Sequence, residues 1–597
     1  MSKSIVDFFN EIDEKPKEKV APKEKKKTVA AFKPSLSSPQ TAKNMSKVLE
    51  ESMPVSELSP EIVEVGEVVY IGDGVCKIDG LSNARIDDVL KIETDKGEVL
   101  TLVLGMSDRL VETVVLGDYF GIKKGQNVIS TRKTLKIGGG KDLLGRVVSP
   151  IGKPMDGKGP IKVGKMMLVE CPAPAVYMRS PIVDQLKTGF VVVDSIIPVG
   201  LGQRELVIGD RKTGKTRLMA DVICNLKGSG MYCIYVAIGS QKAKVKGFTE
   251  YLDRFGALEY TTIVMGSSDD PPSLNYLAPY AGAALAEYFL DQGKNALVIY
   301  DDLSKHAKAY RQMSLLLKRS PGRDAYPGDI FFLHSRLLER SAKLSDKYSG
   351  GSVTALPMAE TQNGDISEYI TTNLMSITDG HIYLDSLMMH DGILPAVNSG
   401  ASVSRIGGSI QPPMLRKLAE LAAGQLARYN EVKSYEIMNT EISLETEREI
   451  AKGKRILEVF TQKSGINYLS DEEVLLLYLV TTGLLDFIDL SVVTNIKKEI
   501  IEFYRDNKDS FSDFAKGAIS VMKSVDEIKP FADHLIETYY NKFDSENSQA
   551  LKTAYLKEIE DKKIKEKEKA DKEAVKKAKE GEKIEEKKEE EKNGDTK

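Results

Sequence analysis

Short stretches of alternating apolar and polar residues fill residues 61–135. The first is EVGEVVYIGDGVCKIDGL, in which the alternation continues on both sides of a Gly-Asp-Gly turn, a pattern typical of a β-hairpin. Later stretches that indicate strands are DDVLKIETDKGEVLTLVLGM, VETVVLGD and QNVIST. Closely spaced strands joined by turns predict a small β-barrel domain in this region.

Residues 136–411 follow a different pattern, in which nearly continuous apolar runs alternate with segments of helical periodicity. The apolar runs are ELVIGD, YCIYVAIGS, TTIVMGSS and NALVIYDD. The helical segments between them are TRLMADVICNLK, VKGFTEYLDRFG and NYLAPYAGAALAEYFLDQG. Strands that are apolar on both faces and alternate with helices predict a parallel sheet with helices on both sides.

Residues 412–547 are helical in pattern, which predicts an α-helical domain. Both ends of the chain are rich in Lys and Glu, so we expect residues 1–60 to be a disordered polar extension and residues 548–597 a solvated charged tail. The alternatives are a short docking helix in VDFFNEI and a partner-binding role for the tail. The predicted fold class is a multidomain α/β protein with a barrel, a parallel-sheet domain and a helical domain.

The composition narrows the functions that this chain can have. With 597 residues and a net charge of −4, the chain can form several domains and has no overall basic charge that would favour nucleic acid. Its four cysteines form no CxxC pair and its five histidines have no HExxH spacing, so we expect free thiols and no zinc site. No apolar run approaches the ~18 residues of a membrane span. We expect a cytoplasmic protein that reaches the cell membrane only through partners.

The segment GDRKTGKT, residues 209–216, fits the phosphate-binding pattern G-x-x-x-x-G-K-[ST]. An apolar strand precedes it and a helical segment follows it, which is the context in which backbone N–H groups and a helix N-terminus bind phosphate. Lys215 is expected near the β- and γ-phosphates, and Thr216 is expected to coordinate magnesium. The predicted nucleotide-binding residues of this loop are Gly209, Asp210, Arg211, Lys212, Thr213, Gly214, Lys215 and Thr216.

Asp301 follows the apolar run NALVIY, at the edge where open α/β sheets bind their ligands. A carboxylate at this position can hold magnesium through a bound water. The alternative is that Asp301 and Asp302 are acidic residues of a turn, with Asp302 supporting the loop. The expected cofactors are therefore ATP or ADP, together with Mg²⁺.

Several segments of the chain resemble the α subunit of F-type ATP synthases. They include GQRELVIGDRKTGKTRL, VIYDDLSKHAKAYRQMSLLLKRSPGRDAYPGDIFFLHSRLLERSAKL, GGSVTALPMAETQNGDISEYI and SGASVSRIGGS, and the resemblance runs from about residue 62 to 510 in the family's order. It implies a β-barrel, a P-loop nucleotide domain and a helical domain. It also implies a ring of three α and three β subunits around a rotating central stalk, with ATP synthesis or hydrolysis coupled to proton transport.

The resemblance further implies a noncatalytic nucleotide site on this chain. Related β subunits carry a glutamate directly after the strand end Val-Gly, where this chain has Ser240 after Gly239. Neither Ser240 nor Gln241 is a carboxylate that could orient or deprotonate the attacking water. The alternative is that Asp269 or Asp270 takes this role.

Arg405 lies in SVSRIGG, which matches the family segment whose arginine reaches the catalytic site of the neighbouring β subunit. By that resemblance Arg405 is an arginine finger. A planar and permanently charged guanidinium suits the charge that spreads over a phosphoryl group in transfer. Without the resemblance, an ordinary loop arginine is the simpler interpretation.

The chain departs from the family pattern around the nucleotide. Lys212 stands where the phosphate loop usually has glutamine, Leu394–Pro395 replaces Arg-Pro, and TQKSGINY replaces the KQGQY loop whose glutamines help to seat adenine. Pro395 and Gln462 are the predicted contacts at the adenine end. The segment SYEIMNTE also differs from the family at the place where α subunits approach the central stalk.

The long charged ends resemble the divergent ATP synthase-like ATPases of mycoplasmas. One alternative is therefore an α-like subunit of a specialised ATPase motor, whose ends bind peripheral-stalk or other motor proteins. A second alternative is a self-sufficient hexameric P-loop ATPase, such as a helicase or a secretion ATPase, although it should carry the glutamate that VAIGSQK lacks. A noncatalytic scaffold in a repurposed motor complex is the third.

Overall fold

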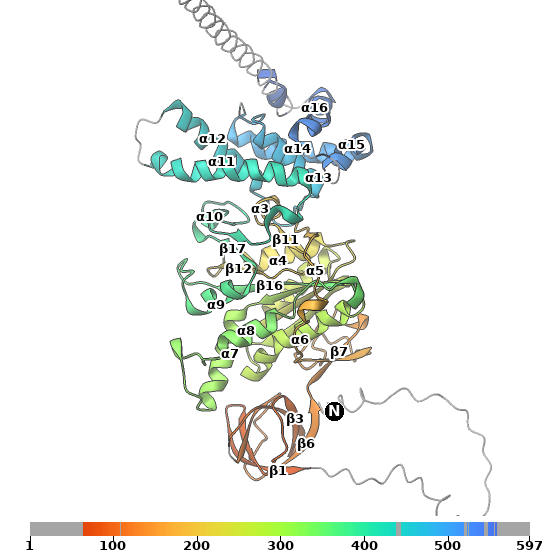
Figure 1. Ribbon diagram of the computed structural model, residues 1–597, viewed down its shortest axis with the longest axis vertical. Coiled ribbons are helices and arrows are strands. Elements are labelled where there is room, and N and C mark those ends of the chain that lie inside the picture. The colour runs from red at the N-terminus through yellow and green to blue at the C-terminus, as the bar shows by residue number, and fades with distance from the viewer. Residues whose placement is uncertain are drawn as a thin grey trace, which may run out of the picture. The chain divides into compact units, whose positions relative to one another are not determined.

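The computed structural model describes residues 64–557, except for 108, 438–442, 487, 519–521, 523, 543–546, 548 and 554–555 (Figure 1). The predicted polar extension, residues 1–60, lies outside the described residues, as does most of the predicted tail, residues 548–597. The described residues form two compact units. The first is built on the residues up to Lys136 with two short segments, Asp270–Leu274 and Gln312–Arg319, and the second contains the other described residues.

The first unit contains a closed antiparallel barrel, to which the described residues contribute six strands (Figure 1). In the order in which they pair, the strands are β1 Val65–Gly72, β2 Val75–Asp79, β5 Leu110–Val115, β4 Gly97–Met106, β3 Asp88–Thr94 and β6 Asn127–Thr134. Pairing of β1 with β6 closes the barrel. Asp73 and Gly74 join β1 to β2 with φ angles of 48° and 82°, the left-handed conformation that a tight hairpin turn requires.

The second unit is built on a sheet in which the described residues form eight strands. From one edge to the other, these are β18 Val403–Ser404, β17 Gly380–Leu384, β12 Glu205–Gly209, β16 Ser352–Glu360, β15 Asn295–Asp301, β13 Tyr232–Ser240, β14 Thr261–Ser267 and β8 Val147–Val148. Neighbouring strands are parallel, apart from the antiparallel pair β17 and β18. Two smaller pairs are β7 Lys136–Gly139 with β9 Lys165–Leu168, and β10 Gln185–Leu186 with β11 Val199–Gly200.

Helices cover both faces of the large sheet (Figure 1). The α-helices described between the barrel and the C-terminal helices are α3 Val191–Ile196, α4 Lys215–Asn225, α5 Lys242–Arg254, α6 Pro272–Leu290, α7 Leu303–Leu316, α8 Ile330–Leu338, α9 Tyr369–Ile377 and α10 Ser386–His390. Leu297 and Ile299 of β15 pack in one apolar cluster with residues of α4 and α5. On the opposite face α6 approaches β13 so closely that a Cβ atom at Gly282 would lie 2.3 Å from Val236 Cγ2. Only glycine fits at that position.

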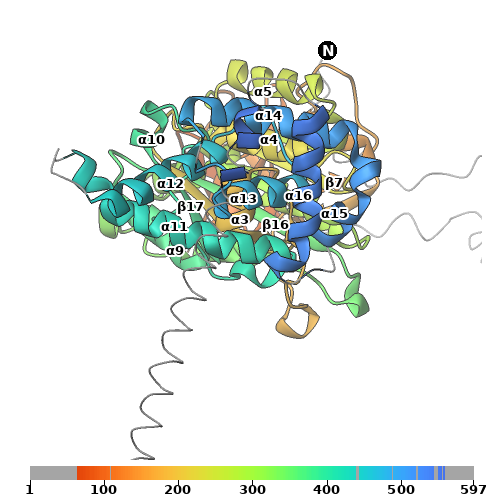
Figure 2. The same cartoon turned by 90° about the horizontal axis from the view of Figure 1, so that it is seen from above.

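The C-terminal part of the second unit is helical (Figures 1 and 2). Its helices are α11 Pro413–Ile437, α12 Leu444–Phe460, α13 Ser470–Thr481, α14 Leu490–Asp506, α15 Ser512–Lys516 and α16 Val525–Lys542. The first eleven residues of α13 are all buried, which explains why residues 474–480 form a continuous apolar run without a polar stripe. Phe460 and Val474 share an apolar cluster with Leu218 and Met219 of α4, so the helical layer and the sheet have a continuous core.

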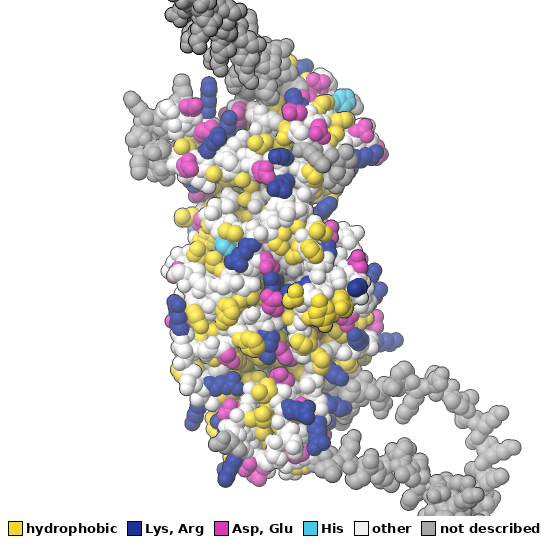
Figure 3. Space-filling model, viewed as in Figure 1, with side chains coloured by type: hydrophobic (Ala, Val, Ile, Leu, Met, Phe, Trp, Pro, Cys, Tyr) yellow, Lys and Arg dark blue, Asp and Glu magenta, His cyan; other side chains and the backbone are white. Residues whose placement is uncertain are grey.

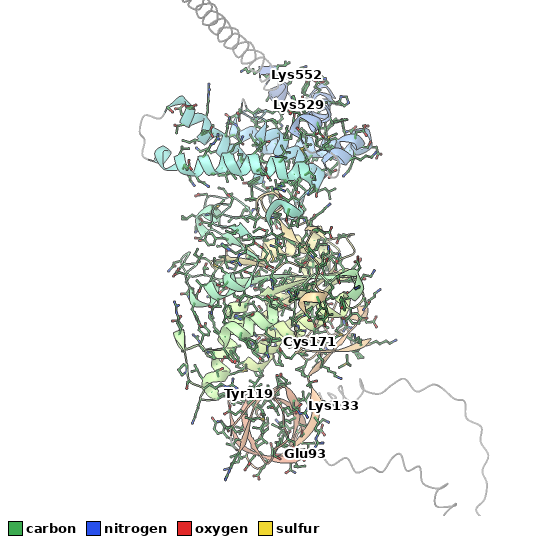
Figure 4. All side chains as sticks on the ribbon, in the orientation of Figure 1. Glu93, Tyr119, Lys133, Cys171, Lys529 and Lys552 are labelled. Carbon is green, nitrogen blue, oxygen red and sulfur yellow. The ribbon has the colours of Figure 1, made fainter. Side chains whose placement is uncertain are left out.

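These elements confirm the predicted fold class of barrel, parallel-sheet domain and helical domain. In the part of the chain that the structure describes, no helix combines the length and the apolar character that crossing a bilayer requires. The four cysteines are free thiols, of which Cys76 and Cys233 are buried and Cys171 and Cys224 are half-buried. Cys171 is labelled in Figure 4, and its thiol donates to Glu287 over 3.2 Å. Basic and acidic side chains are interspersed on the face shown in Figure 3.

Candidate functional site

The carboxyl ends of four neighbouring strands bring the predicted site residues to one edge of the sheet. Strands β12, β16, β15 and β13 end at Gly209, Glu360, Asp301 and Ser240. Gly209 is in register with Glu360, and Asp301 is in register with Ala237 of β13. Because the strands run parallel, all four ends open on the same side of the sheet, which is the side where α/β proteins bind ligands.

The phosphate loop connects β12 to α4 through a tight turn. Gly214 has a left-handed conformation, with φ of 92°, directly before the first residue of α4, and Lys212 has φ of 65°. A Cβ atom at Gly214 would meet no atom within 4 Å, so the backbone on this side is open to a ligand. The first N–H groups of α4 have no partners inside the helix and carry its positive dipole end. The turn is therefore an anion-binding surface made of backbone.

Lys215 is held inside the loop and is almost completely buried. Its Nζ atom donates to the carbonyl oxygens of Gly209 and Asp210, over 2.5 and 2.6 Å. Burial lowers the pKa of Lys215, and the nearby carboxylates, Glu360 foremost, oppose this shift. A cation so placed can exchange loop carbonyls for phosphate oxygens without a large movement.

Asp301 and Thr216 meet across the site. The Thr216 hydroxyl donates to Asp301 Oδ2 over 3.1 Å, and the buried Tyr235 hydroxyl donates to the same oxygen. Lys244 Nζ lies 3.8 Å from it. Hydroxyl and carboxylate oxygens are the ligands that Mg²⁺ prefers, usually completed by water and substrate phosphates. In the part of the chain that the structure describes, no group of three or more His, Cys, Asp or Glu side chains could hold a metal ion.

Asp302 and Asp210 support the walls of the site. The Asp302 carboxylate is buried and accepts from the Lys305 N–H over 2.8 Å, and burial raises its pKa. Asp210 Oδ1 accepts from the Thr361 hydroxyl over 2.7 Å and from the Gly364 N–H over 3.0 Å. Both carboxylates therefore hold neighbouring segments in place.

A pocket of about 480 Å³ opens beside the loop. Its lining residues are Asp210, Arg211, Ser304, Lys308, Glu360, Thr361, Gln362, Asn363 and Glu368. Arg211 Nε pairs with Glu360 over 3.1 Å, and burial raises the pKa of Glu368. The loop arginine is thereby turned toward the end of β16.

Gln462 links several segments at the predicted adenine end of the site. Its backbone N–H donates to the Leu394 carbonyl over 2.5 Å, which places it beside Pro395. The side-chain amide is buried, and protein groups satisfy its hydrogen bonds. Its Oε1 atom accepts from the Val191 N–H over 2.7 Å, and its Nε2 atom donates to the carbonyls of Gly189 and Ile466 over 2.9 and 3.1 Å. The amide thus joins the 462–466 loop to the sheet domain.

A second network at this end involves residues that no motif had indicated. The Arg217 guanidinium lies 3.8 Å from the ring centre of Tyr251 and bonds to Ser464. Ser464 in turn donates to Asp221 over 2.6 Å, and Asn467 donates to the Asp221 carbonyl over 3.1 Å. These residues come from α4, α5 and the loop between α12 and α13, so only the tertiary structure assembles them.

Ser240 ends β13 with a buried side chain. Its hydroxyl lies 3.4 Å from the Ile238 carbonyl of its own strand. Asp269, the acid that sequence alone left as an alternative, is exposed and pairs with Lys242 over 3.3 Å. A hydroxyl therefore occupies the end of β13, next to β15, whose last residue is Asp301.

Arg405 follows the edge strand β18, two strands away from β12 in the sheet. Its N–H donates to the Asp379 carbonyl over 2.9 Å, which fixes the backbone. Its side chain is exposed. Burial raises the pKa of Glu205, the first residue of β12, and the charge of Arg405 opposes this shift, so Arg405 lies near the end of β12 opposite to the phosphate loop. The structure therefore leaves the Arg405 guanidinium apart from the phosphate loop of its own chain.

Comparisons with known proteins agree with this architecture. The family models that match are the beta-barrel domain of the ATP synthase alpha/beta family over residues 62–132, its nucleotide-binding domain over 189–404 and its C-terminal domain over 411–535. The chain is 46% identical to ATP synthase subunit alpha of Caldanaerobacter subterraneus subsp. tengcongensis over 473 residues, 79% of this chain and 93% of that protein.

It is 42% identical to ATP synthase subunit alpha of Petrotoga mobilis over 500 residues, 84% of this chain and 98% of that protein. Identity of this extent covers the barrel, the sheet domain and the helical domain together. It confirms the resemblance that the motifs indicated. The chain belongs to the ATP synthase alpha/beta family, among the α subunits of the F type.

Proposed function

We propose that this chain binds ATP or ADP with Mg²⁺ at its phosphate loop and serves as a regulatory, noncatalytic nucleotide-binding subunit. Lys215 binds the β- and γ-phosphates, the loop N–H groups bind the remaining phosphate oxygens, and Thr216 coordinates the metal directly. Asp301 holds the metal through a water molecule. Magnesium, when bound, neutralises charge on the phosphates.

We infer a noncatalytic role because the end of β13 offers no basic side chain. Hydrolysis needs a group that orients the attacking water and accepts its proton. Ser240, with its hydroxyl directed to its own strand, is not basic at neutral pH. The nucleotide on this chain is therefore retained and stabilises the subunit, since a ligand that binds only the folded state adds to its stability.

Arg405 is proposed to act on the nucleotide of a neighbouring β-type catalytic subunit. Its exposed side chain and fixed backbone suit a group that is inserted into another chain's site. There the guanidinium stabilises charge on the transferring γ-phosphoryl group. The chain thus contributes to catalysis in a site that it completes rather than contains.

At the base end, we propose that Pro395 and Gln462 border the adenine. Gln462 acts by holding the 462–466 loop against Leu394 and Gly189, because its amide is already occupied by protein groups. The ordered loop then forms one side of the base pocket.

The assembly proposed from the family is an alternating ring of three such chains and three β-type subunits around a central stalk. Two relatives carry the name ATP synthase subunit alpha, which supports ATP synthesis or hydrolysis coupled to proton transport at the cytoplasmic face of a membrane. Contact with the membrane is made through the complex, and nucleic acid is not a partner. Peripheral-stalk or other proteins bind the charged ends.

A second candidate is an α-like subunit of a specialised motor coupled to other machinery. The charged segments 1–60 and 548–597 lie beyond the residues that the family models match, which favours partners of a different kind. Affinity purification from the native cells distinguishes the two. Co-purification of proton-channel subunits supports the synthase, and their replacement by other motor or surface proteins supports the second candidate.

The noncatalytic role is tested in the reconstituted complex with its β-type partner. Lys215→Gln should abolish MgATP binding to the purified chain but leave the initial rate of hydrolysis by the complex within a few-fold of the wild type. Lys246→Gln, which removes a surface lysine that pairs with Glu250, is the matched control. Complete loss of hydrolysis with Lys215→Gln, or rapid turnover by the purified wild-type chain, would contradict the proposal.

A further inference from the structure

Lys244 places an additional cation at the carboxylate that is proposed to hold magnesium. It lies in the first turn of α5, and its Nζ atom is 3.8 Å from Asp301 Oδ2. The flanking lysines of the same helix are directed elsewhere: Lys242 pairs with Asp269 over 3.3 Å, and Lys246 pairs with Glu250 over 3.7 Å. Among these three lysines, only Lys244 reaches the nucleotide site.

The oxygen that Lys244 approaches already has a defined role in the site. Asp301 Oδ2 accepts from the hydroxyls of Thr216 and Tyr235, and its side chain is almost completely buried. A buried carboxylate requires a nearby positive charge or several donors. Lys215 is engaged with the loop carbonyls, so Lys244 is the lysine that pairs with Asp301 directly.

The surroundings of Lys244 allow its ammonium group to serve a ligand as well. Its side chain is 53% exposed and ends a flexible four-carbon stem, so the group can turn from Asp301 to a phosphate oxygen. A lysine is a compact point charge with three donors, which suits phosphate. Asp301 and the phosphates are the two anionic groups that magnesium would bridge.

We propose that Lys244 acts as a built-in counter-ion, so that this chain retains ATP when divalent cations are removed and Mg²⁺ competes with Lys244 for Asp301. With Lys244 in this role, the phosphate loop also binds a nucleoside triphosphate that carries no metal ion. This inference rests on the proposed nucleotide binding at the phosphate loop. It assigns Lys244 a role in the metal dependence of that binding.

The experiment measures the ATP dissociation constant of the purified full chain by calorimetric titration, with excess Mg²⁺ and with EDTA. The wild type should lose no more than about tenfold in affinity in EDTA. Lys244→Gln should weaken binding in EDTA by a further factor of about ten, as loss of one charged hydrogen bond predicts, and should change binding in Mg²⁺ less than twofold.

Lys242→Gln is the matched control, because it removes the same charge from the same turn of α5 without touching Asp301. It should leave both dissociation constants unchanged, while Lys244→Arg should retain binding in EDTA. Equal effects of Lys242→Gln and Lys244→Gln, or unchanged binding by Lys244→Gln in EDTA, would overturn the role of Lys244. Failure of the wild type to bind ATP even in Mg²⁺ would refute the proposed nucleotide site and this inference with it.

Discussion

The hydroxyl of Thr216, at the start of α4, donates to the carboxylate of Asp301, at the end of β15, over 3.1 Å. The two residues are 85 positions apart in the sequence. Parallel strands with helices between them bring the phosphate loop and the acidic strand end to the same edge of the sheet. This contact marks the position proposed for magnesium, between the oxygens of the chain and a nucleotide.

Replacing Thr216 tests that position directly. Thr216→Val keeps the shape of the side chain but removes the hydroxyl, so the affinity for MgATP should fall about tenfold while the affinity in EDTA changes little. Titration of the purified chain under both conditions measures the difference. Thr249→Val, in which a hydroxyl bonded to the Val245 carbonyl of α5 is lost, is the control. An equal loss in both conditions would contradict a metal-ligand role.

Arg405→Ala should reduce ATP hydrolysis by the complex with the β-type subunit by about a thousandfold, in the range reported for arginine fingers. ATP binding to the β-type site should change only slightly, because the finger acts on the transition state. Arg405→Lys should recover little activity, since an ammonium cannot reproduce the planar fork. Arg416→Ala, on the surface of α11 beside Glu420, is the control, and an unchanged rate with Arg405→Ala would remove the finger role.

Gln462→Ala should lower the free energy of unfolding by about 2 kcal/mol, because three hydrogen bonds of a buried amide are lost together. Denaturant titration measures the change. The ratio of ATP to GTP affinity should stay the same, since the amide is occupied by protein groups rather than exposed to a base. Gln425→Ala, which removes a single longer bond to the Thr481 carbonyl, is the control. A selective loss of ATP affinity would show that Gln462 reads adenine itself.

Because His306 is buried, we expect the folded protein to lose stability in mild acid. The ring is completely buried between His334 and the Tyr276 carbonyl, and burial lowers its pKa from 6.5 to about 4. The folded protein therefore resists protonation while the unfolded chain accepts it, so the stabilising contribution is full above pH 6.5 and is lost as the pH falls toward 4. Since each unit of pKa difference corresponds to about 1.36 kcal/mol, protonation of His306 should lower the free energy of unfolding by roughly 3 kcal/mol in total.

Urea titrations between pH 5 and 7.5 measure this dependence. His306→Gln should be less stable at pH 7.5 but should lose less stability between pH 7.5 and 5 than the wild type. His534→Gln, at an exposed position of α16, should keep the steeper wild-type dependence. Parallel curves for the wild type and His306→Gln would exclude His306 as the source.

Breaking the buried ion pair of Arg340 and Glu287 should lower the stability of the fold strongly. Both guanidinium contacts are 2.7 Å long, and a third bond of the same length reaches the Val169 carbonyl. Arg340→Met leaves a buried carboxylate unpaired and should cost about 3–5 kcal/mol, of which Glu287→Gln in the same chain should restore part. Lys165→Met breaks the exposed pair with Asp291 and should cost less than about 1 kcal/mol. Similar losses for the two single variants would contradict the prediction.

Local patterns were sufficient where one short segment carries the whole signal. The turn of Asp73 and Gly74, the buried runs that became β12, β13, β14 and β15, and the phosphate loop were each predictable because backbone conformation and burial on both faces leave a direct mark on composition. The amide of Gln462 shows the limit of such patterns. The resemblance of its loop to the family pattern indicated an adenine contact, but whether a buried amide is free depends on groups from distant segments.

The sequence by itself determined the architecture, the family and the chemistry available at the phosphate loop, since strand and helix periodicity and the order of the motifs are properties of the chain alone. Only the tertiary structure decided which of those groups meet. The approach of Lys244 to Asp301, the bond from Tyr235 to the same oxygen and the occupied amide of Gln462 arise from packing between elements far apart in sequence. No local pattern records these contacts, because the energy of a contact depends on which surfaces the fold brings together.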